Sequence, residues 1–158
     1  MAVGDFVFFN QALHDLGNKV HGLASETFHV ALVTGATVPT KDTPAPHWGG
    51  TGTTNFATNQ VPTGTAYTGP TSVSPCTWGL VSGEPTWAAA ADPEWAKDAT
   101  NGFSTAAYAI FFNNTDANKR CIGFVDLNGN KSNVGGPFKL DLDASGGTTR
   151  IGKVASVG

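Results

Sequence analysis

The stretch that decides the fold runs from Ser104 to Asp143 and reads STAAYAIFFNNTDANKRCIGFVDLNGNKSNVGGPFKLDLD. Three apolar runs occur in it, and short polar segments rich in Asn and Gly separate them. Short apolar runs bounded by turn residues are typical of β-strands. The last run, FKLDL, places apolar side chains at alternate positions, which predicts one buried face. We therefore predict three strands joined by two turns, the second of them a tight hairpin at Asn128-Gly129.

Similar short runs occupy much of the remaining sequence. The segment from Glu26 to Gly35 alternates apolar and polar residues, as expected for a strand with one buried face. The runs that begin at Cys76 and Pro85 flank the turn signal Ser82-Gly83-Glu84, which predicts a hairpin, and a final run, TTRIGKVAS, ends the sequence. About seven or eight short strands at regular spacing predict an all-β fold, either a β-sandwich or a jelly roll.

One short helix is expected near the N-terminus. In FFNQALHDLGNKVHG, residues 8–22, Leu13, Leu16 and Val20 fall at helical spacing, and Asn10 can act as the N-cap. Gly17 weakens the helix, so we expect two or three turns at most. A chain of 158 residues is long enough for one domain with a substantial core, and we predict a single domain over residues 1–158.

Residues 36–75 differ from the rest, because they are rich in Thr, Gly and Pro and show no helical period. So long a stretch without regular structure is rare in a compact domain unless it binds something. We predict an extended arm or loop excursion, with a short strand near Tyr67–Val73, that becomes ordered on a neighbouring chain. Because a few buried aromatic side chains usually dominate contact energy, Trp48, Phe56 and Tyr67 are the candidate partner-binding residues.

Charge and hydropathy argue against two classes of partner. Charged residues make up 13% of the chain, the net charge is -3, and Lys119-Arg120 is the one adjacent basic pair. Nucleic-acid binding depends largely on neutralising phosphates, so we predict none. No stretch approaches the roughly 20 apolar residues of a membrane span, and the start, MAVGDFVFFNQ, lacks the features of a signal peptide. We expect a protein made in the cytoplasm that does not enter a membrane.

The segment from Asp126 to Asn130 resembles the start of a calcium loop. Such a loop needs Gly at its sixth position and a bidentate Glu at its twelfth, and these positions hold Lys131 and Pro137 here. The turn chemistry of Asn128-Gly129 explains the same residues without an ion. We therefore predict no metal site.

Catalytic signatures are also missing from the sequence. It contains no G-x-S-x-G elbow and no phosphate-binding loop, and its four histidines lack the spacing of zinc ligands. The carboxylate pairs Asp141 with Asp143 and Asp92 with Glu94 fit solvated surface groups, since a catalytic pair must flank a cleft. We predict that the protein is not an enzyme and binds no cofactor.

Two cysteines and four tryptophans leave alternatives open. Cys76 and Cys121 each lie in an apolar run, and they are either free buried thiols or, if geometry permits, a disulfide. Trp78 and Trp87 lie on adjacent predicted strands, where they fill the core or a subunit contact. An exposed aromatic platform that binds sugars is the alternative for these side chains.

Two blocks of the sequence carry a family resemblance. The first is FFNQALHDLGNKVHGLASETFHVALVTG, residues 8–35, and the second begins at AAYAIFFNN and ends at LDLD, residues 106–143. Together they resemble small structural proteins of tailed bacteriophages. Those proteins commonly combine a strand of the form YA-hydrophobic-Y/F-N, a strand IGFVD and a strand GPF-hydrophobic.

The resemblance implies a virion protein and brings no catalytic residue with it. Its leading implication is a capsid decoration (cement) protein on the capsid surface, which would bind and stabilise the assembled head. The expected partners are the major capsid protein and further copies of this chain as a homo-oligomer. The alternative is a tail or fibre component that binds the host surface, with a glycan as one target.

Overall fold

Antiparallel strands form most of the regular secondary structure. The computed structural model describes residues 4–142 and the backbone of residues 150–153. Its largest sheet has five strands in the order β1-β10-β9-β2-β5, and every neighbouring pair in it is antiparallel. The strands of this sheet are β1 (Phe6–Phe8), β2 (Phe28–Val33), β5 (Thr71–Ser72), β9 (Ala106–Asn113) and β10 (Cys121–Lys131).

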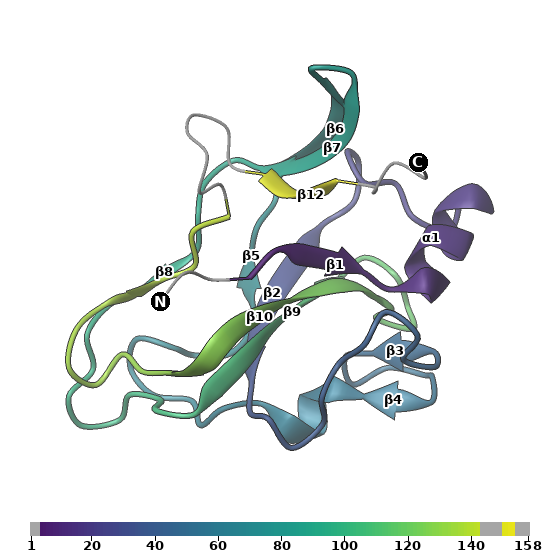
Figure 1. The fold of residues 1–158 in the computed structure, drawn as a ribbon. Coiled ribbons are helices and arrows are strands. Elements are labelled where there is room, and N and C mark those ends of the chain that lie inside the picture. The colour runs from purple at the N-terminus through teal and green to yellow at the C-terminus, as the bar shows by residue number, and fades with distance from the viewer. Residues whose placement is uncertain (1–3, 143–149, 154–158) are drawn as a thin grey trace.

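A second antiparallel sheet has three strands in the order β12-β7-β6. They are β6 (Cys76–Val81), β7 (Glu84–Ala89) and β12 (Arg150–Lys153). Strands β6 and β7 form the predicted hairpin, which projects away from the larger sheet at the top of Figure 1. Its loop is Ser82-Gly83, and both residues have positive φ, as a two-residue hairpin loop requires.

Two short strand pairs complete the fold. Strand β8 (Glu94–Trp95) pairs antiparallel with β11 (Phe138–Lys139), and β3 (Pro46–His47) pairs parallel with β4 (Thr54–Asn55). A 3-10 helix, η1, follows β4 over Phe56–Asn59.

Aromatic side chains fill the space between the two larger sheets. Trp87 on β7 is 0% exposed, and its ring centroid lies 4.9 Å from that of Phe28 on β2 and 5.8 Å from that of Phe6 on β1. Its indole N–H donates to the carbonyl of Leu23 at 3.2 Å, so the one polar atom of the ring is satisfied. The predicted all-β, sandwich-like architecture with one short helix is confirmed, and the jelly-roll form stays a prediction.

The predicted helix is present as α1 (Asn10–Gly17), which is about two turns long. It begins one residue earlier than an N-cap at Asn10 would require: Phe9 is the N-cap, and no side chain caps the helix. Asn10 is used elsewhere, because its backbone N–H donates to the Lys41 carbonyl and its side chain to Asp42. The helix ends at Gly17, so Val20 lies outside it.

The interpretation of Asn128-Gly129 as a hairpin turn is wrong. Both residues have the positive φ that their turn chemistry favours, but the chain continues along the same strand, β10. Asp126 pairs with Tyr108 and Lys131 with Ala106, so several residues of β10 lie opposite one residue of β9. The segment is therefore a bulge. The FKLDL run does not pair with β10, because its strand β11 joins β8 instead.

The prediction of an extended arm at residues 36–75 is corrected by its burial. Phe56 is 0% exposed, and Val61, Tyr67 and Val73 are also buried in the common core of this chain. Val61 N–H donates to the Leu32 carbonyl at 3.0 Å, and Leu32 N–H donates to the Tyr67 hydroxyl at 3.1 Å. The segment thus packs along the edge of β2, and it is ordered without a neighbouring chain.

The Asp98 side chain connects the 36–75 segment to residues 100–101 through hydrogen bonds. One carboxylate oxygen accepts hydrogen bonds from the backbone N–H groups of Thr65 and Ala66, and the other accepts from those of Asn101 and Thr100. These bonds, led by the one from Asn101, lower the pKa of the Asp98 carboxyl. The loop geometry around Tyr67 therefore depends on a charged Asp98.

Candidate functional site

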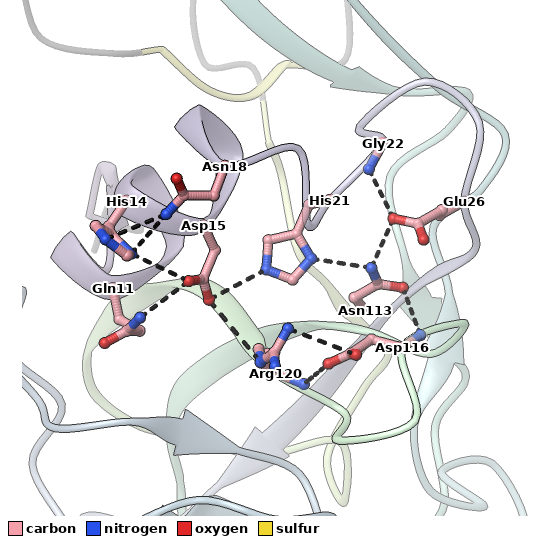
Figure 2. A network of polar contacts seen from close by, with 10 residues as sticks. All are labelled: Gln11, His14, Asp15, Asn18, His21, Gly22, Glu26, Asn113, Asp116 and Arg120. Atoms are coloured by element: carbon pink, nitrogen blue, oxygen red, sulfur yellow. Dashed lines mark hydrogen bonds and ion pairs between the residues drawn. The ribbon is translucent and has the colours of Figure 1, made fainter.

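The densest group of polar side chains lies between helix α1 and the turn that joins β9 to β10 (Figure 2). We call this group the α1 cluster. Helix α1 supplies one side of it, the segment between α1 and β2 supplies another, and the end of β9 with the following turn supplies the third. Its members are Gln11, His14, Asp15, Asn18, His21, Gly22, Glu26, Asn113, Asp116 and Arg120.

Asp15 is a buried carboxylate of α1 with two different environments at its oxygens. Oδ1 accepts a hydrogen bond from Gln11 Nε2 at 2.9 Å. Oδ2 lies 3.8 Å from His21 Nε2, which is too far for a hydrogen bond, and 4.0 Å from Arg120 Nε, which is an ion-pair distance. Within the described residues neither Asp15 Oδ2 nor His21 Nε2 has a hydrogen-bond partner. Attraction across this gap holds the helix toward the turn.

Asn113 fixes the protonation pattern of the cluster. Its Oδ1 accepts from the backbone N–H groups of Thr115 and Asp116, so its Nδ2 must be the group that faces His21 and Glu26. Nδ2 lies 3.0 Å from His21 Nδ1 and 2.8 Å from Glu26 Oε2. Because Nδ2 can only donate, His21 Nδ1 is the acceptor, and the proton of the neutral ring is on Nε2, facing Asp15.

The cluster carries an excess of negative charge. It contains three carboxylates, those of Asp15, Glu26 and Asp116, and one guanidinium, that of Arg120, which lies 4.0 Å from Asp15 and 3.8 Å from Asp116. Burial lowers the pKa of His21 below its ordinary value of 6.5, and the nearby carboxylates, led by Asp15, oppose this shift. The imidazole is therefore neutral at pH 7, and Arg120 is the cation of the cluster.

A pocket of about 130 Å³ opens beside the cluster. It offers a carboxylate from Asp15, a guanidinium from Arg120 and the exposed residue Thr51. Ligand sites for drug-sized molecules are usually about 300 Å³ or larger, so this pocket suits a single side chain or a few water molecules. Its lining residues are Gln11, Asp15, Ala45, Pro46, Thr51 and Arg120.

The arrangement of the α1 cluster fits a structural role, in which polar contacts hold three segments together, better than a catalytic one. The His21 side chain is 0% exposed, whereas a general base must come within hydrogen-bond reach of a reactant. Its contacts instead run between α1, the segment before β2 and the β9–β10 turn. In the part of the chain that the structure describes, no group of three or more His, Cys, Asp or Glu side chains could hold a metal ion.

The structure separates the three predicted partner-binding residues. Phe56 is 0% and Tyr67 is 1% exposed, so both are core residues of this chain and have no surface to offer a partner. Burial raises the pKa of Tyr67 to about 12. Trp48 is partly buried and its ring stacks on Phe112 at 5.4 Å between centroids. Trp48 is thus the one of the three that can still contact a partner.

The calcium-like stretch is a local turn motif. Asp126 is exposed, and its Oδ1 accepts a hydrogen bond from the Asn128 backbone N–H at 2.8 Å. This bond occupies the carboxylate with its own turn, as Asx turns do. Of the two other candidate carboxylate pairs, Asp92 forms an ion pair with Lys139 at 3.0 Å, and Asp141 is exposed. Asp143 lies outside the described residues.

The cysteines and tryptophans follow the simpler of the alternatives, with one exception. Cys76 and Cys121 are buried and free, and burial raises the pKa of the Cys121 thiol well above its ordinary value. Trp87 fills the core. Trp78, directly opposite Trp87 on the neighbouring strand, remains 40% exposed.

The α1 cluster was missed from the sequence. His21 and Asn113 are 92 positions apart, and neither belongs to a motif that names a partner. The one available signal was the polar turn Asn113–Asp116, whose first side chain caps two following N–H groups. That pattern is a common Asx motif, so it indicates a turn without indicating the buried histidine.

The chain was compared with family models, curated proteins and solved structures, and none of them matches it. Among the described residues no helix is long and apolar enough to cross a membrane.

Proposed function

We propose that the protein is a structural component of a tailed-bacteriophage virion, specifically a decoration protein that binds the assembled capsid. The observation that carries this proposal is the sequence resemblance over residues 8–35 and 106–143. These blocks supply α1, β2, β9, β10 and β11, and thus three of the five strands of the larger sheet. The resemblance therefore concerns the scaffold of the fold.

Such a protein acts by thermodynamic linkage. It binds the assembled shell in preference to the free capsid subunit, so its binding free energy stabilises the shell. Many copies on one particle multiply a modest contact through avidity. A surface with few charges favours this role, since charged residues are depleted where interfaces are fully buried. Its partners are then the major capsid protein and further copies of itself.

Trp48 marks a surface for the capsid contact. Its backbone N–H donates to the Lys119 carbonyl at 2.9 Å, which places it against the β9–β10 turn. Pro46 and Thr51, which flank it in the sequence, line the pocket beside the α1 cluster. A partly buried aromatic residue next to a small polar pocket resembles the centre of many interaction hot spots. The pocket has room for one side chain of a capsid subunit.

Co-sedimentation with capsids tests the proposal. Purified protein is mixed with capsids assembled without it, and the bound copies per particle are counted. Saturable binding to capsids, with little binding to free capsid subunits, is the expected result. Trp48→Ala should weaken binding about tenfold or more, while Val134→Ala, at an exposed apolar residue elsewhere, should leave it unchanged. Absence of saturable binding by the wild-type chain contradicts the proposal.

A point substitution is more informative here than a deletion. Removing residues 44–64 would take Phe56 and Val61 out of the core, so loss of binding could not be separated from loss of folding. Trp48→Ala keeps both residues in place, and a thermal melt of the variant checks its fold.

The exposed Trp78 favours a second candidate, a tail or fibre component that binds a host glycan. Aromatic rings that are open to solvent can stack on sugars, and Trp78 is 40% exposed. Binding of the protein to host surface glycans, abolished by Trp78→Ala, would support this candidate. The decoration proposal expects no glycan binding.

A further inference from the structure

The β6–β7 hairpin carries an exposed apolar face. Leu80 is 73% and Trp78 is 40% exposed, and they lie two positions apart on the same face of β6. Trp78 lies opposite the core residue Trp87, and Leu80 lies opposite Pro85 near the hairpin loop. The apolar face of the core therefore continues outward along the projecting hairpin seen in Figure 1.

The outer edge of β6 is open. Strand β6 is the last strand in the order β12-β7-β6, and no other described strand pairs with it. Residues that flank a two-residue hairpin loop form a hydrogen-bonded pair, here Val81 with Glu84. Because hydrogen-bonded and non-hydrogen-bonded pairs alternate, the N–H and C=O groups of Trp78 and Leu80 point away from β7. These groups form a template for another strand.

Strand β6 lacks the features that usually protect an edge. Its six residues, CTWGLV, contain no charged residue and no proline, and its pairing with β7 shows no bulge. Protected edges normally carry a lysine, a proline or a bulge, because a flat apolar edge pairs with other chains. An open edge and an exposed apolar face thus coincide on one strand.

We propose that β6 pairs antiparallel with β6 of a second copy of this chain, around a two-fold axis at Gly79. In this register Trp78 lies opposite Leu80 of the partner subunit, and Leu80 lies opposite Trp78 of the partner subunit. Both exposed residues are covered, and the two three-stranded sheets join into one sheet. The inference rests on the part of the proposed function that concerns contacts between copies.

A second copy fits this edge because the strand is complementary to itself. A two-fold axis places β6 of one copy beside β6 of the other. Because the strand carries no charged residue, no like charges meet in this pairing. The residue on the axis, Gly79, meets its own equivalent. A Cβ built on Gly79 would meet nothing within 4 Å among the described residues, so a larger side chain can be placed here without a clash on that face of the strand.

The expected dimer is weak. A contact along one six-residue strand is well below the roughly 1,600 Å² of a standard stable interface. We expect a dissociation constant between about 10 μM and 1 mM. Self-association of this strength matters at the high local concentration that repeated copies on one surface provide.

Sedimentation of the purified full-length chain tests the association. The wild type should shift from monomer to dimer with rising concentration, and Leu80→Thr should weaken the dimer about tenfold or more. Val38→Thr is the matched control, since Val38 is 61% exposed but lies on a different segment. A wild-type chain that stays monomeric up to about 1 mM overturns the inference, as does an equal effect of both substitutions.

Cysteine cross-linking tests the register. The two Gly79 Cα atoms should be about 4.5 Å apart, within the range of a disulfide, so Gly79→Cys should form a covalent dimer under mild oxidation. Thr77→Cys is the control on the same face, because the two copies of that residue lie about 13 Å apart in this register. The native cysteines are buried and give little background. Equal or faster cross-linking of Thr77→Cys overturns the register.

The proposed decoration function and the proposed pairing of β6 with a second copy can be refuted independently of each other. Capsid co-sedimentation of the wild-type chain tests the decoration function and does not require a free dimer in solution. A wild-type monomer whose capsid binding is lost on Leu80→Thr would assign this face to the capsid protein, and the self-pairing would be wrong. Glycan binding that disappears on the same substitution would overturn it in favour of a host ligand.

Discussion

Asn113→Ala is the sharpest test of how the polar turn after β9 stabilises the fold. The side chain is 0% exposed and makes four hydrogen bonds: two as a donor, to His21 and Glu26, and two as an acceptor, from the N–H groups of Thr115 and Asp116. Alanine removes all four. The helix segment and the turn are then joined mainly by the longer contacts of Asp15 and Arg120.

The expected cost follows from the burial of each partner. A buried acceptor left without its donor costs about 1–3 kcal/mol, and this applies to His21 Nδ1. Glu26 Oε2 keeps a donor, the Gly22 N–H at 2.7 Å, so its loss lies near the lower end of that range. Thr115 is exposed and Asp116 is partly exposed, so water replaces much of the bonding to their N–H groups. We expect unfolding free energy to fall by about 3–4 kcal/mol in total.

Urea unfolding followed by tryptophan fluorescence measures this change, with an unchanged m-value as the check for two-state behaviour. Asn114→Ala is the matched control: its amide accepts from Lys119 Nζ at 3.1 Å in a partly exposed setting, and it should cost less than about 1 kcal/mol. A loss below about 1 kcal/mol for Asn113→Ala, or equal losses for both variants, would refute the account of the cluster.

Asn113→Asp adds a readout that simple loss of volume would not produce. The new carboxylate keeps the two backbone N–H donors but faces the Glu26 carboxylate, which it can no longer supply with a hydrogen bond. Protonation of one carboxyl restores the missing donor, so the cost of the substitution should shrink between pH 7 and pH 5. A cost that is independent of pH would contradict the assigned orientation of the amide.

Three further outcomes are expected. Burial lowers the folded-state pKa values of His21 and His29, so their contribution to stability is present above pH 6.5 and is lost as pH falls through the folded-state pKa values. The unfolding free energy should therefore decrease from pH 8 to pH 5. An unfolding free energy that does not change over this range would contradict the expectation. Gly129→Val should cost about 1–3 kcal/mol in the same urea assay, because its φ of +98° strains a β-branched residue. Calcium or a chelator should not shift the melting temperature, and Asp126→Ala should change it little; a calcium-dependent rise that this substitution removes would show a genuine ion site.

The strands were predictable where the pattern is local. Strands β2 and β9 and the Ser82-Gly83 hairpin all appear at the expected positions. The prediction of a single buried face for β2 is wrong, because Ala31 and Val33 on its second face are also 0% exposed. The same local logic failed at Asn128-Gly129. Its dihedral preference was right, but pairing with β9 on both sides of the turn made it a bulge. Whether Asn128-Gly129 forms a hairpin turn or a bulge depends on the partner strand, which the local sequence does not specify.

The remaining errors concern contacts between distant parts of the chain. Residues 36–75 contain few apolar residues, and these are widely spaced, so no periodicity indicates that Phe56, Val61 and Tyr67 share one core. Their burial depends on the edge of β2, which lies earlier in the sequence. The α1 cluster is similar, since it joins groups from three separate segments. Composition could indicate a surface poor in charge, but it could not show where Trp78 and Leu80 would lie.

Quantitative mass spectrometry of purified phage particles tests the central claim most directly. The ratio of this chain to the major capsid protein is measured in particles that have been purified by density gradient and freed of lysate protein. A decoration protein should be present in a fixed ratio to the capsid protein, at tens to hundreds of copies per particle, the range that avidity over a repeating shell requires. Absence from the particles, with the chain found only in the infected-cell lysate, would contradict the claim.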